Sequence, residues 1–583
     1  MCSGVERARF SYADDIGILG IGPTVAESAS SAQREVDSLM DWAKENAVSF
    51  DTSKSEVIHF PGRKREEGVE IQINGSNIKP AEHIRWLGVH LDPKLSFKHH
   101  VTTWCGKALK AAQHIRRLNS VRRGAAPSAL VTVVDMCVVP VATFGADVWW
   151  PGRTRPTANG TSAPHATFLC NLIDKAVLLA LRAALPVWKT TPNAVIHREG
   201  GIPPARILLE ANRLRVAARL NSLDDRHPLR SRATICPNTG TLKYKKTRKF
   251  SKRPEIQMSR LQRAYQQLPP AEAALPLSAP KYNKADGTKL EGAKVHLEWI
   301  SSISPTDICA YSDGSSEGHG RSSWGYVLQR NGKTFEKGQG ILHGGEVYDA
   351  EITGAIMALQ AAIPASRTGE KVFVLLDNQA AVNSLRTGKS SSSLSKTQKF
   401  YDIACKVNAK VRWVPGHSKI TGNEEADAAA RAALKLLPPR HAQPEYISLA
   451  YQRRYMHDLQ QKLVDDWWLN TRPARYCNLD LLMRRRKPPE LAMPRRLLHR
   501  LIAARTGHGD FVSYHRRFKH ADACMNCACG LETSPTHFIR CRLHASQMRK
   551  LRKGETMNAF ISQLLGPKCL EKFTEFVRIT ECF

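Results

Sequence analysis

One stretch of this sequence, residues 307–434, constrains the fold more than any other, because it places acidic side chains among clearly patterned elements. Short apolar runs typical of buried strands alternate there with helical patterns, which favours a mixed α/β domain. Strand ends and two helices can bring several side chains to one point. The side chains concerned are Asp313, Glu351, Asp377, His417 and Asp427.

Each of these residues has an expected local setting. Asp313 and Asp377 directly follow apolar runs, so we expect each to stand at the end of a buried strand. Apolar residues at helical spacing put Glu351 on a helix, beside its buried stripe. A Pro-Gly break leads into a loop with His417, and Asn423 is expected to cap a helix that carries Asp427.

Carboxylates that meet at one point repel one another and resist ionisation unless cations neutralise them. Two divalent cations roughly 3.5–4 Å apart would do so and would clamp a phosphate for attack by water. Oxygen ligands with open positions suit Mg²⁺ or Mn²⁺ rather than Zn²⁺. A single aspartate after a strand is usually a turn residue, and a lone loop histidine is usually solvated. The five together favour a two-metal nuclease site, in which His417 would help to protonate the leaving group or release product.

This stretch resembles type-I ribonuclease H in four motifs: D-G-S after the first strand, the helix glutamate, the strand-end D-N, and G-H-x-x-x-x-G-N-E-x-A-D. The resemblance implies a mixed five-stranded sheet with flanking helices, and an endonuclease that cuts the RNA strand of RNA–DNA hybrids. It implies that four carboxylates hold the metals, with His417 as the auxiliary residue. Integrases and transposases share the fold class, but their usual acidic triad lacks the helix glutamate and the G-H-S loop.

The chain has 583 residues and a net charge of +33, of which only +3 falls within residues 306–437. The excess on the flanks implies a polyanionic partner, most simply DNA, RNA or their hybrid. We find no signal peptide and no apolar run long enough for a membrane span, and we expect no small-molecule cofactor. We therefore predict an intracellular and nuclear protein that does not bind membranes.

The first residues hold a second signal, Y-A-D-D, in which a tight turn pushes Asp14 and Asp15 toward a common metal. With the later K-S-E and W-L-G-V segments, it resembles the second half of the reverse-transcriptase palm of LINE-type, non-LTR retrotransposons. Polymerisation by two metals needs a third carboxylate, and Glu6 is the only acidic residue among the eleven that precede the motif. We predict no polymerase activity from this chain alone. The rival interpretations are an RNA-directed DNA polymerase whose first half is missing from the gene prediction, and a non-catalytic nucleic-acid-binding relic.

The last signal is a cysteine cluster near the C-terminus, which in a reduced setting indicates metal rather than disulfides. Five residues are candidates for the four ligand positions of one structural Zn²⁺ knuckle, and the spacing does not decide which cysteine is left out. The five are Cys524, Cys527, Cys529, His537 and Cys541.

Basic residues in two places are candidate nucleic-acid contacts. The first group lies in the run K-Y-K-K-T-R-K, and the second lies close to the knuckle. The residues are Lys245, Lys246, Arg248, Arg505, Arg516 and Arg517.

We therefore expect a multidomain α/β protein, a 5′-truncated retrotransposon product, with a ribonuclease H-like domain between helical and basic segments. The expected parts are a partial palm (1–95), a helical thumb or connection (96–230), a basic linker (231–300), the ribonuclease H domain (301–437), and a basic helical region (438–583) with the knuckle at 524–541.

Overall fold

The computed structural model describes residues 9–61, 68–120, 123–150, 152–156, 162–164, 166–223, 227, 268, 271, 289–318, 321–436, 447–484 and 487–580. The chain forms two compact units, one of Met1–Leu209 with Val464–Phe583 and one of Glu210–Leu463. Two helices, α8 (Ala205–Asn221) and α16 (Leu449–Thr471), each contribute residues to both units. Among the described residues, no helix is both long and apolar enough to cross a membrane.

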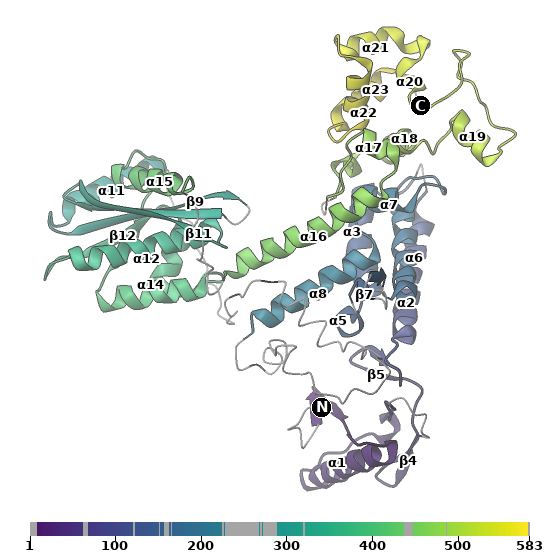
Figure 1. Cartoon of the computed structure of the whole chain (residues 1–583), viewed down its shortest axis with the longest axis horizontal. Coiled ribbons are helices and arrows are strands. Elements are labelled where there is room, and N and C mark those ends of the chain that lie inside the picture. Colours follow the sequence, from purple (N-terminus) through teal and green to yellow (C-terminus); the bar gives the residue numbers. More distant parts are fainter. Residues whose placement is uncertain are drawn as a thin grey trace. The chain divides into compact units, whose positions relative to one another are not determined.

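The second unit is built on a five-stranded sheet with the order β11-β10-β9-β12-β13 (Figure 1). β9, β10 and β11 pair in antiparallel fashion, whereas β12 runs parallel to both β9 and β13. The predicted mixed five-stranded sheet is confirmed. Its strands are β9 (Ile308–Gly318), β10 (Arg321–Arg330), β11 (Lys333–His343), β12 (Val372–Leu376) and β13 (Lys410–Trp413).

Helices cover both faces of this sheet, and Figure 1 shows α12 and α14 on one side with α11 and α15 on the other. Alternate residues of β9 point to the two sides, so Ile308 and Ala310 pack toward α12 while Cys309 and Tyr311 pack toward α15. The helices are α11 (Lys289–Ser302), α12 (Val347–Ala365), α13 (Gln379–Thr387), α14 (Leu394–Lys406) and α15 (Thr421–Ala433).

Part of the range assigned to the linker is ordered. α11 begins at Lys289, and its Trp299 and Ile300 pack against the core on the α15 side of the sheet. The ring of Trp299 also meets the guanidinium of Arg412 at 4.4 Å. The core of the second unit therefore extends upstream of residue 301.

The central strand β9 is longer than its apolar run. The expectation that the strand ends at Asp313 is wrong, because β10 pairs with β9 as far as Gly318 and holds Asp313 opposite Gly325. The strand is buried through Asp313 and becomes partly exposed beyond it. The aspartate therefore projects from within a paired strand, where β10 fixes its backbone, while the pairing of β9 with β12 ends two residues earlier at Tyr311.

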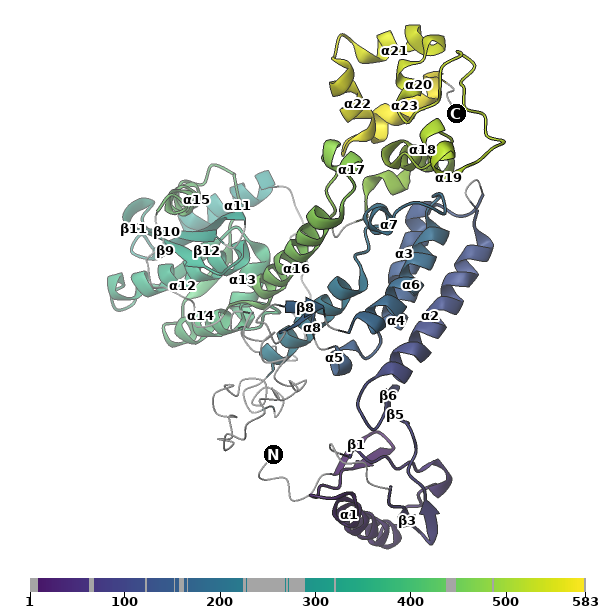
Figure 2. The same ribbon diagram turned by 45° about the vertical axis from the view of Figure 1, so that its right-hand side comes forward.

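The first unit begins with small hairpins and continues with helices, as expected for its sequence. The Y-A-D-D turn joins β1 to β2, and the W-L-G-V turn joins β5 to β6. Helices α2 and α6 lie side by side in both views (Figure 2). The elements before α8 are β1 (Arg9–Tyr12), β2 (Asp15–Ile18), α1 (Val25–Glu45), β3 (Ile71–Ile73), β4 (Ser76–Ile78), β5 (Ile84–Trp86), β6 (Val89–Leu91), α2 (Lys98–Leu118), α3 (Pro127–Val133), α4 (Val139–Ala142), α5 (Ala146–Trp149), β7 (Thr154–Pro156), β8 (Ser162–Pro164), α6 (Thr167–Ala184) and α7 (Asn193–Gly200).

The C-terminal part of this unit packs on its N-terminal helices. Arg495 donates hydrogen bonds to the carbonyls of Ser120 and Ala184, at 3.0 and 2.8 Å. The C-terminal helices are α17 (Ala474–Asn478), α18 (Arg495–Thr506), α19 (Val512–Phe518), α20 (His537–Arg540), α21 (Ala545–Arg552), α22 (Met557–Leu565) and α23 (Leu570–Thr580).

We predict that Gly325→Ala destabilises the second unit. A Cβ at Gly325 would lie 2.4 Å from the backbone nitrogen of Ala430 and 2.6 Å from the carbonyl oxygen of Ala426, so α15 would have to move off the sheet. Overpacking of this kind costs about 1–3 kcal/mol. Urea unfolding, followed by hydrogen exchange of β9 and β10, measures the loss. The control is Gly106→Ala, where the added methyl meets nothing within 4 Å; equal stability of the two variants would contradict the prediction.

Candidate metal centre

Three carboxylates from three elements meet beside the sheet. Asp313 lies on β9, Glu351 lies on α12, and Asp377 directly follows β12. One oxygen from each carboxylate lies within 4.8 Å of the other two. Asp313 and Glu351 are buried, 8% and 4% exposed, and Asp377 is half-buried. The arrangement can hold a cation against the sheet while leaving one side open.

The fourth predicted carboxylate belongs to an adjoining group. Asp427 on α15 lies with His417 and Glu424, and the ligand atoms of these three residues also fall within 4.8 Å of one another. A side-chain hydrogen bond between Asp427 and Asp313 links this group to the first. Arg431 pairs with Asp427 at 2.7 Å. The two groups therefore form one continuous acidic site.

Glu424 is a site residue that the sequence reasoning missed. It lies three positions before Asp427 on α15, a spacing that places two side chains on one helix face. That spacing inside G-N-E-E-A-D was the available signal.

The histidine loop passes close to Asp377. A Cβ at Gly416 would lie 2.3 Å from Asp377 Oδ2, so the position admits no side chain. His417 follows, exposed, with a φ of +54° in the left-handed region that non-glycine residues rarely adopt. The hydroxyl of Ser418 donates to the carbonyl of Gly416 at 3.2 Å. The loop thus presents the imidazole to solvent at the rim of the site.

Two amide side chains contact the carboxylates. The prediction that Asn423 caps α15 is wrong, because the helix begins at Thr421 with Ile420 as its cap. The buried amide of Asn423 instead donates to Asp377 Oδ2 at 3.4 Å. Asn378 caps α13 through Ala381, and its side chain hydrogen-bonds with Glu351. These contacts orient the acids.

Burial and mutual repulsion hold protons on the inner acids. Burial, followed by the negative charge of Asp377, raises the pKa of Asp313 to about 7, although the N–H of Gly314 opposes the shift from 2.7 Å. Burial, then Asp313 and Asp377, raise the pKa of Glu351 well above its ordinary value, and its bond with Asn378 opposes that rise.

The donor set fits divalent cations with oxygen preference. Glu351 Oε2 is buried and has no hydrogen-bond partner, so it has a lone pair directed at neither protein nor solvent. Carboxylate oxygens of Asp313 and Asp377 lie within 4.8 Å of a carboxylate oxygen of Glu351. An oxygen-rich cluster of this kind suits Mg²⁺ or Mn²⁺, whose charge would offset the repulsion that raises the two pKa values.

The structure brings together four of the five candidate zinc ligands. Ligand atoms of Cys527, Cys529, His537 and Cys541 lie within 4.8 Å of one another. Cys529 Sγ is 3.3 Å from His537 Nε2, and Cys527 Sγ is 3.9 Å from Cys541 Sγ. Cys524 lies outside this group and is exposed, and its thiol donates a hydrogen bond to the carbonyl of Asn526. Three thiols and one imidazole are a suitable set for structural Zn²⁺.

The paired aspartates of the N-terminal hairpin stand apart from other ligands. Asp14 and Asp15 are exposed, and Tyr12 pairs with Asp15 across the turn. Among the residues that the structure describes, no group of three candidate metal ligands includes either of them.

The candidate nucleic-acid contacts fall into three situations. Arg505 is a correction, because it is 0% exposed and its guanidinium pairs with Glu199 at 3.3 Å and Glu490 at 2.7 Å, which leaves it no surface for a ligand. Arg516 is exposed and paired with Glu532, and Arg517 is exposed. The predicted contacts Lys245, Lys246 and Arg248 lie outside the described residues.

Comparison with known proteins adds a family to this geometry. The family described as RNase H matches residues 305–435, which run from before β9 to beyond α15. Ribonuclease H of Ruegeria pomeroyi is 32% identical over 155 residues, covering 23% of this chain and 97% of that protein.

Two further relatives are proteins of mobile elements. The RNA-directed DNA polymerase from mobile element jockey of Drosophila funebris is 33% identical over 94 residues, covering 16% of this chain and 10% of that protein. The retrovirus-related Pol polyprotein from type-1 retrotransposable element R1 of Nasonia vitripennis is 23% identical over 194 residues, covering 32% of this chain and 58% of that protein. The chain is therefore similar to non-LTR retrotransposon polyproteins and spans about a tenth of the jockey polymerase.

We predict that the metal-free second unit loses stability as pH rises from about 4 to about 7. The pKa of Asp313 rises from 3.8 to about 7 on folding, so the folded state keeps a proton that the unfolded chain has lost. Each pKa unit corresponds to about 1.4 kcal/mol. Urea unfolding in EDTA across this range measures the slope. Mg²⁺ at pH 7 should restore stability, and Asp313→Asn should flatten the slope while Asp402→Asn, an exposed α14 control, should not. Stability that rises with pH in EDTA would contradict this.

We predict that the purified chain carries one zinc through the four clustered residues. Cys541→Ser should lose the zinc, because Cys541 is one of the four and is 2% exposed. Cys524→Ser makes the same chemical change outside the group and should keep it. Atomic emission of desalted protein gives the stoichiometry, and loss in both variants would overturn the assignment.

Proposed function

The chain belongs to the ribonuclease H family, and from that premise we propose that it hydrolyses the RNA strand of RNA–DNA hybrids with divalent cations as cofactors. The observation that carries the proposal is the meeting of Asp313, Glu351 and Asp377 within 4.8 Å, next to Asp427 and His417. The activity of any longer polyprotein is a separate matter, since the match to the jockey polymerase covers 10% of that protein.

The four carboxylates would hold Mg²⁺ or Mn²⁺. When bound, two such ions supply positive charge that orients a phosphate and makes water a better nucleophile. Glu351 contributes an unpartnered buried oxygen, and Asp313 contributes a carboxyl with a pKa near 7, so both would give up protons on binding cations. Loading should therefore be weaker below neutral pH.

The chain's own residues orient this site. Asn423 and Asn378 hold Asp377 and Glu351 by their amides. Gly416 lets the histidine loop approach Asp377 directly. Asp313 is fixed by its pairing with Gly325 of β10, and two residues earlier Tyr311 of the same strand pairs with β12. Such preorganisation favours catalysis, because the acids need not rearrange when a phosphodiester binds.

His417 is suited to moving a proton at the rim. Its imidazole is exposed and lies in the group formed with Glu424 and Asp427. We propose that it donates a proton to the 3′ oxygen that leaves the scissile phosphate, with Glu424 orienting the imidazole. Its position outside the buried core allows exchange of that proton with solvent.

The rest of the chain would supply affinity. The segments outside residues 306–437 carry a net charge of +30, which suits contacts with nucleic-acid phosphates. The zinc group at Cys527–Cys541 would stabilise a small module. The exposed Arg517 on α19, which precedes that group in the sequence, would add a contact with phosphate. In a non-LTR retroelement, such a protein would remove template RNA after first-strand synthesis.

We predict that the full chain cuts the labelled RNA strand of a hybrid in Mg²⁺, and that Asp377→Asn lowers the rate about a hundredfold or more. The change removes a charge from the carboxylate group while keeping the side chain's shape. Asp402→Asn, on the exposed face of α14, is the matched control and should cut normally. The measurement is single-turnover cleavage resolved on a gel.

Two results would count against the proposal. If Asp377→Asn cut as fast as the wild type, the cleavage would come from another site. If the wild type bound hybrid but cut nothing in Mg²⁺ or Mn²⁺, the protein would be a non-catalytic nucleic-acid-binding relic.

A further inference from the structure

The beginning of α12, the helix that carries Glu351, is held by residues distant in sequence. Asp349 lies two positions before Glu351 and is 1% exposed. Its carboxylate accepts hydrogen bonds from three donors, which belong to three different parts of the second unit. They are the backbone N–H of Glu346 at 2.7 Å, the hydroxyl of Ser393, and the hydroxyl of Ser448 at 2.6 Å.

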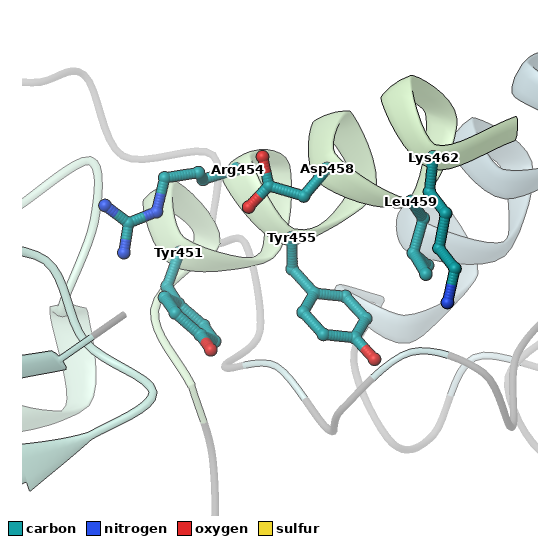
Figure 3. Close-up of a pocket in the computed structure, with 6 residues that line it drawn as sticks. All are labelled: Tyr451, Arg454, Tyr455, Asp458, Leu459 and Lys462. Carbon is teal, nitrogen blue, oxygen red and sulfur yellow. The ribbon is translucent and has the colours of Figure 1, made fainter. Parts of the chain in front are cut away.

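The helix α16 makes a second contact at the same place. Ser448 directly precedes α16, and its hydroxyl also accepts from the backbone N–H of Tyr451 at 3.2 Å. In the second turn, Arg454 pairs with Glu346 at 3.0 Å, and one nitrogen of its guanidinium, Nη2, is buried. Figure 3 shows Arg454 beside Tyr451 and Tyr455, and all three line a hollow of about 270 Å³ on this helix. The guanidinium of Arg454 lies 5.6 Å from the centre of the Tyr451 ring.

These contacts fix the first turn of α12 rather than an arbitrary part of the surface. Glu346 is the helix cap and Asp349 is its third residue, and their side chains and backbones bond reciprocally as a capping box. The same two residues receive Ser448 and Arg454. The start of α16 therefore contacts the capping box that fixes the first turn of α12. Asp349 of this capping box lies two positions before Glu351.

The two residues that contact the capping box, Ser448 and Arg454, lie outside the segment that matches the RNase H family. The RNase H match ends at residue 435, and both Ser448 and Arg454 follow it. A buried carboxylate such as Asp349 needs its donors, because an unsatisfied one is costly. Some of the hydrogen bonds and ion pairs that hold α12 therefore come from the start of α16, which lies beyond the family match.

We propose that the start of α16 is a brace for the metal site, in which Ser448 and Arg454 act as positioning residues for Glu351 through Asp349 and Glu346. The inference rests on the proposed function, because it assigns those residues a role in that reaction. Neither side chain is among the grouped metal ligands. The brace would set the position of Glu351, and hence cation binding and turnover, without contributing to the affinity for the hybrid.

The test compares Ser448→Ala and Arg454→Ala with the wild type, all as full chains. We expect kcat for hybrid cleavage to fall between about tenfold and a hundredfold, since small displacements of a reacting group have effects of that size. KM for the hybrid should stay within about twofold. The Mg²⁺ concentration for half-maximal rate should rise about threefold or more, a change that general destabilisation of a still-folded protein would not produce.

Matched controls use the same substitutions at neighbouring positions. Ser366→Ala removes a hydroxyl at the opposite end of α12, where it bonds only to the carbonyl of Ile363 among the contacts described. Arg453→Ala removes an exposed arginine beside Arg454. Both controls should keep wild-type kcat and Mg²⁺ dependence. Circular dichroism should show that all four variants are folded at the assay temperature; if Ser448→Ala does not fold, Ser448→Gly and Ser448→Thr take its place.

Calorimetric titration with Mg²⁺ alone separates this inference from the function it rests on. If the wild type binds Mg²⁺ but cuts no hybrid, the proposed function fails, while weaker Mg²⁺ binding by Ser448→Ala still supports the brace. If Ser448→Ala and Arg454→Ala both show wild-type Mg²⁺ binding and kcat, the brace is refuted even though the nuclease stands.

Discussion

Mutual repulsion among carboxylates within a largely buried site is the condition on which the rest of the second unit depends. Asp313 and Glu351 are almost fully buried, and burial with neighbouring negative charge raises the pKa of both. Such a group of acids is stable only if protons or cations neutralise it. A site like this costs stability in the metal-free protein, and the sheet and helices around it must compensate.

Close backbone contact is the means by which the fold holds these acids together. Gly325 lets α15 lie directly on β10, and Gly314 lets α12 lie directly on β9, with its absent Cβ 2.6 Å from the nitrogen of Glu351. Gly416 does the same for the histidine loop over Asp377. Side chains at these positions would separate the elements by more than a cation site can tolerate, since ligand distances to Mg²⁺ are about 2 Å.

The first unit is organised by charge in a different way. Arg505 is fully buried between Glu199 and Glu490, and Tyr476 adds a hydrogen bond to Glu199 at 2.7 Å. Partners from α7, α17 and α18 thus share one internal network, which joins the C-terminal residues to the N-terminal helices. Removing a single member would leave an unpaired buried charge, which is strongly destabilising. At least one of the chain's basic residues, Arg505, therefore serves internal structure.

The sequence by itself determined the type of site and its elements. Apolar runs and helical spacing were enough to place Asp377 after a strand, Glu351 on a helix and the mixed sheet around them, because those patterns follow from local geometry. Cysteine and histidine spacing indicated a metal knuckle without choosing its ligands, since five candidates satisfy the same spacing.

Tertiary structure decided what local patterns do not encode. The strand through Asp313 extends because of its pairing with β10, Asn423 turns toward Asp377, and Cys524 falls outside the cysteine group. Arg505 is chemically like the exposed Arg517, and only the fold buries it beside two glutamates. The hydrogen bond between Ser448, just before α16, and Asp349 of α12 joins residues 99 positions apart. No periodicity in the sequence predicts such a contact, because it depends on how whole elements pack.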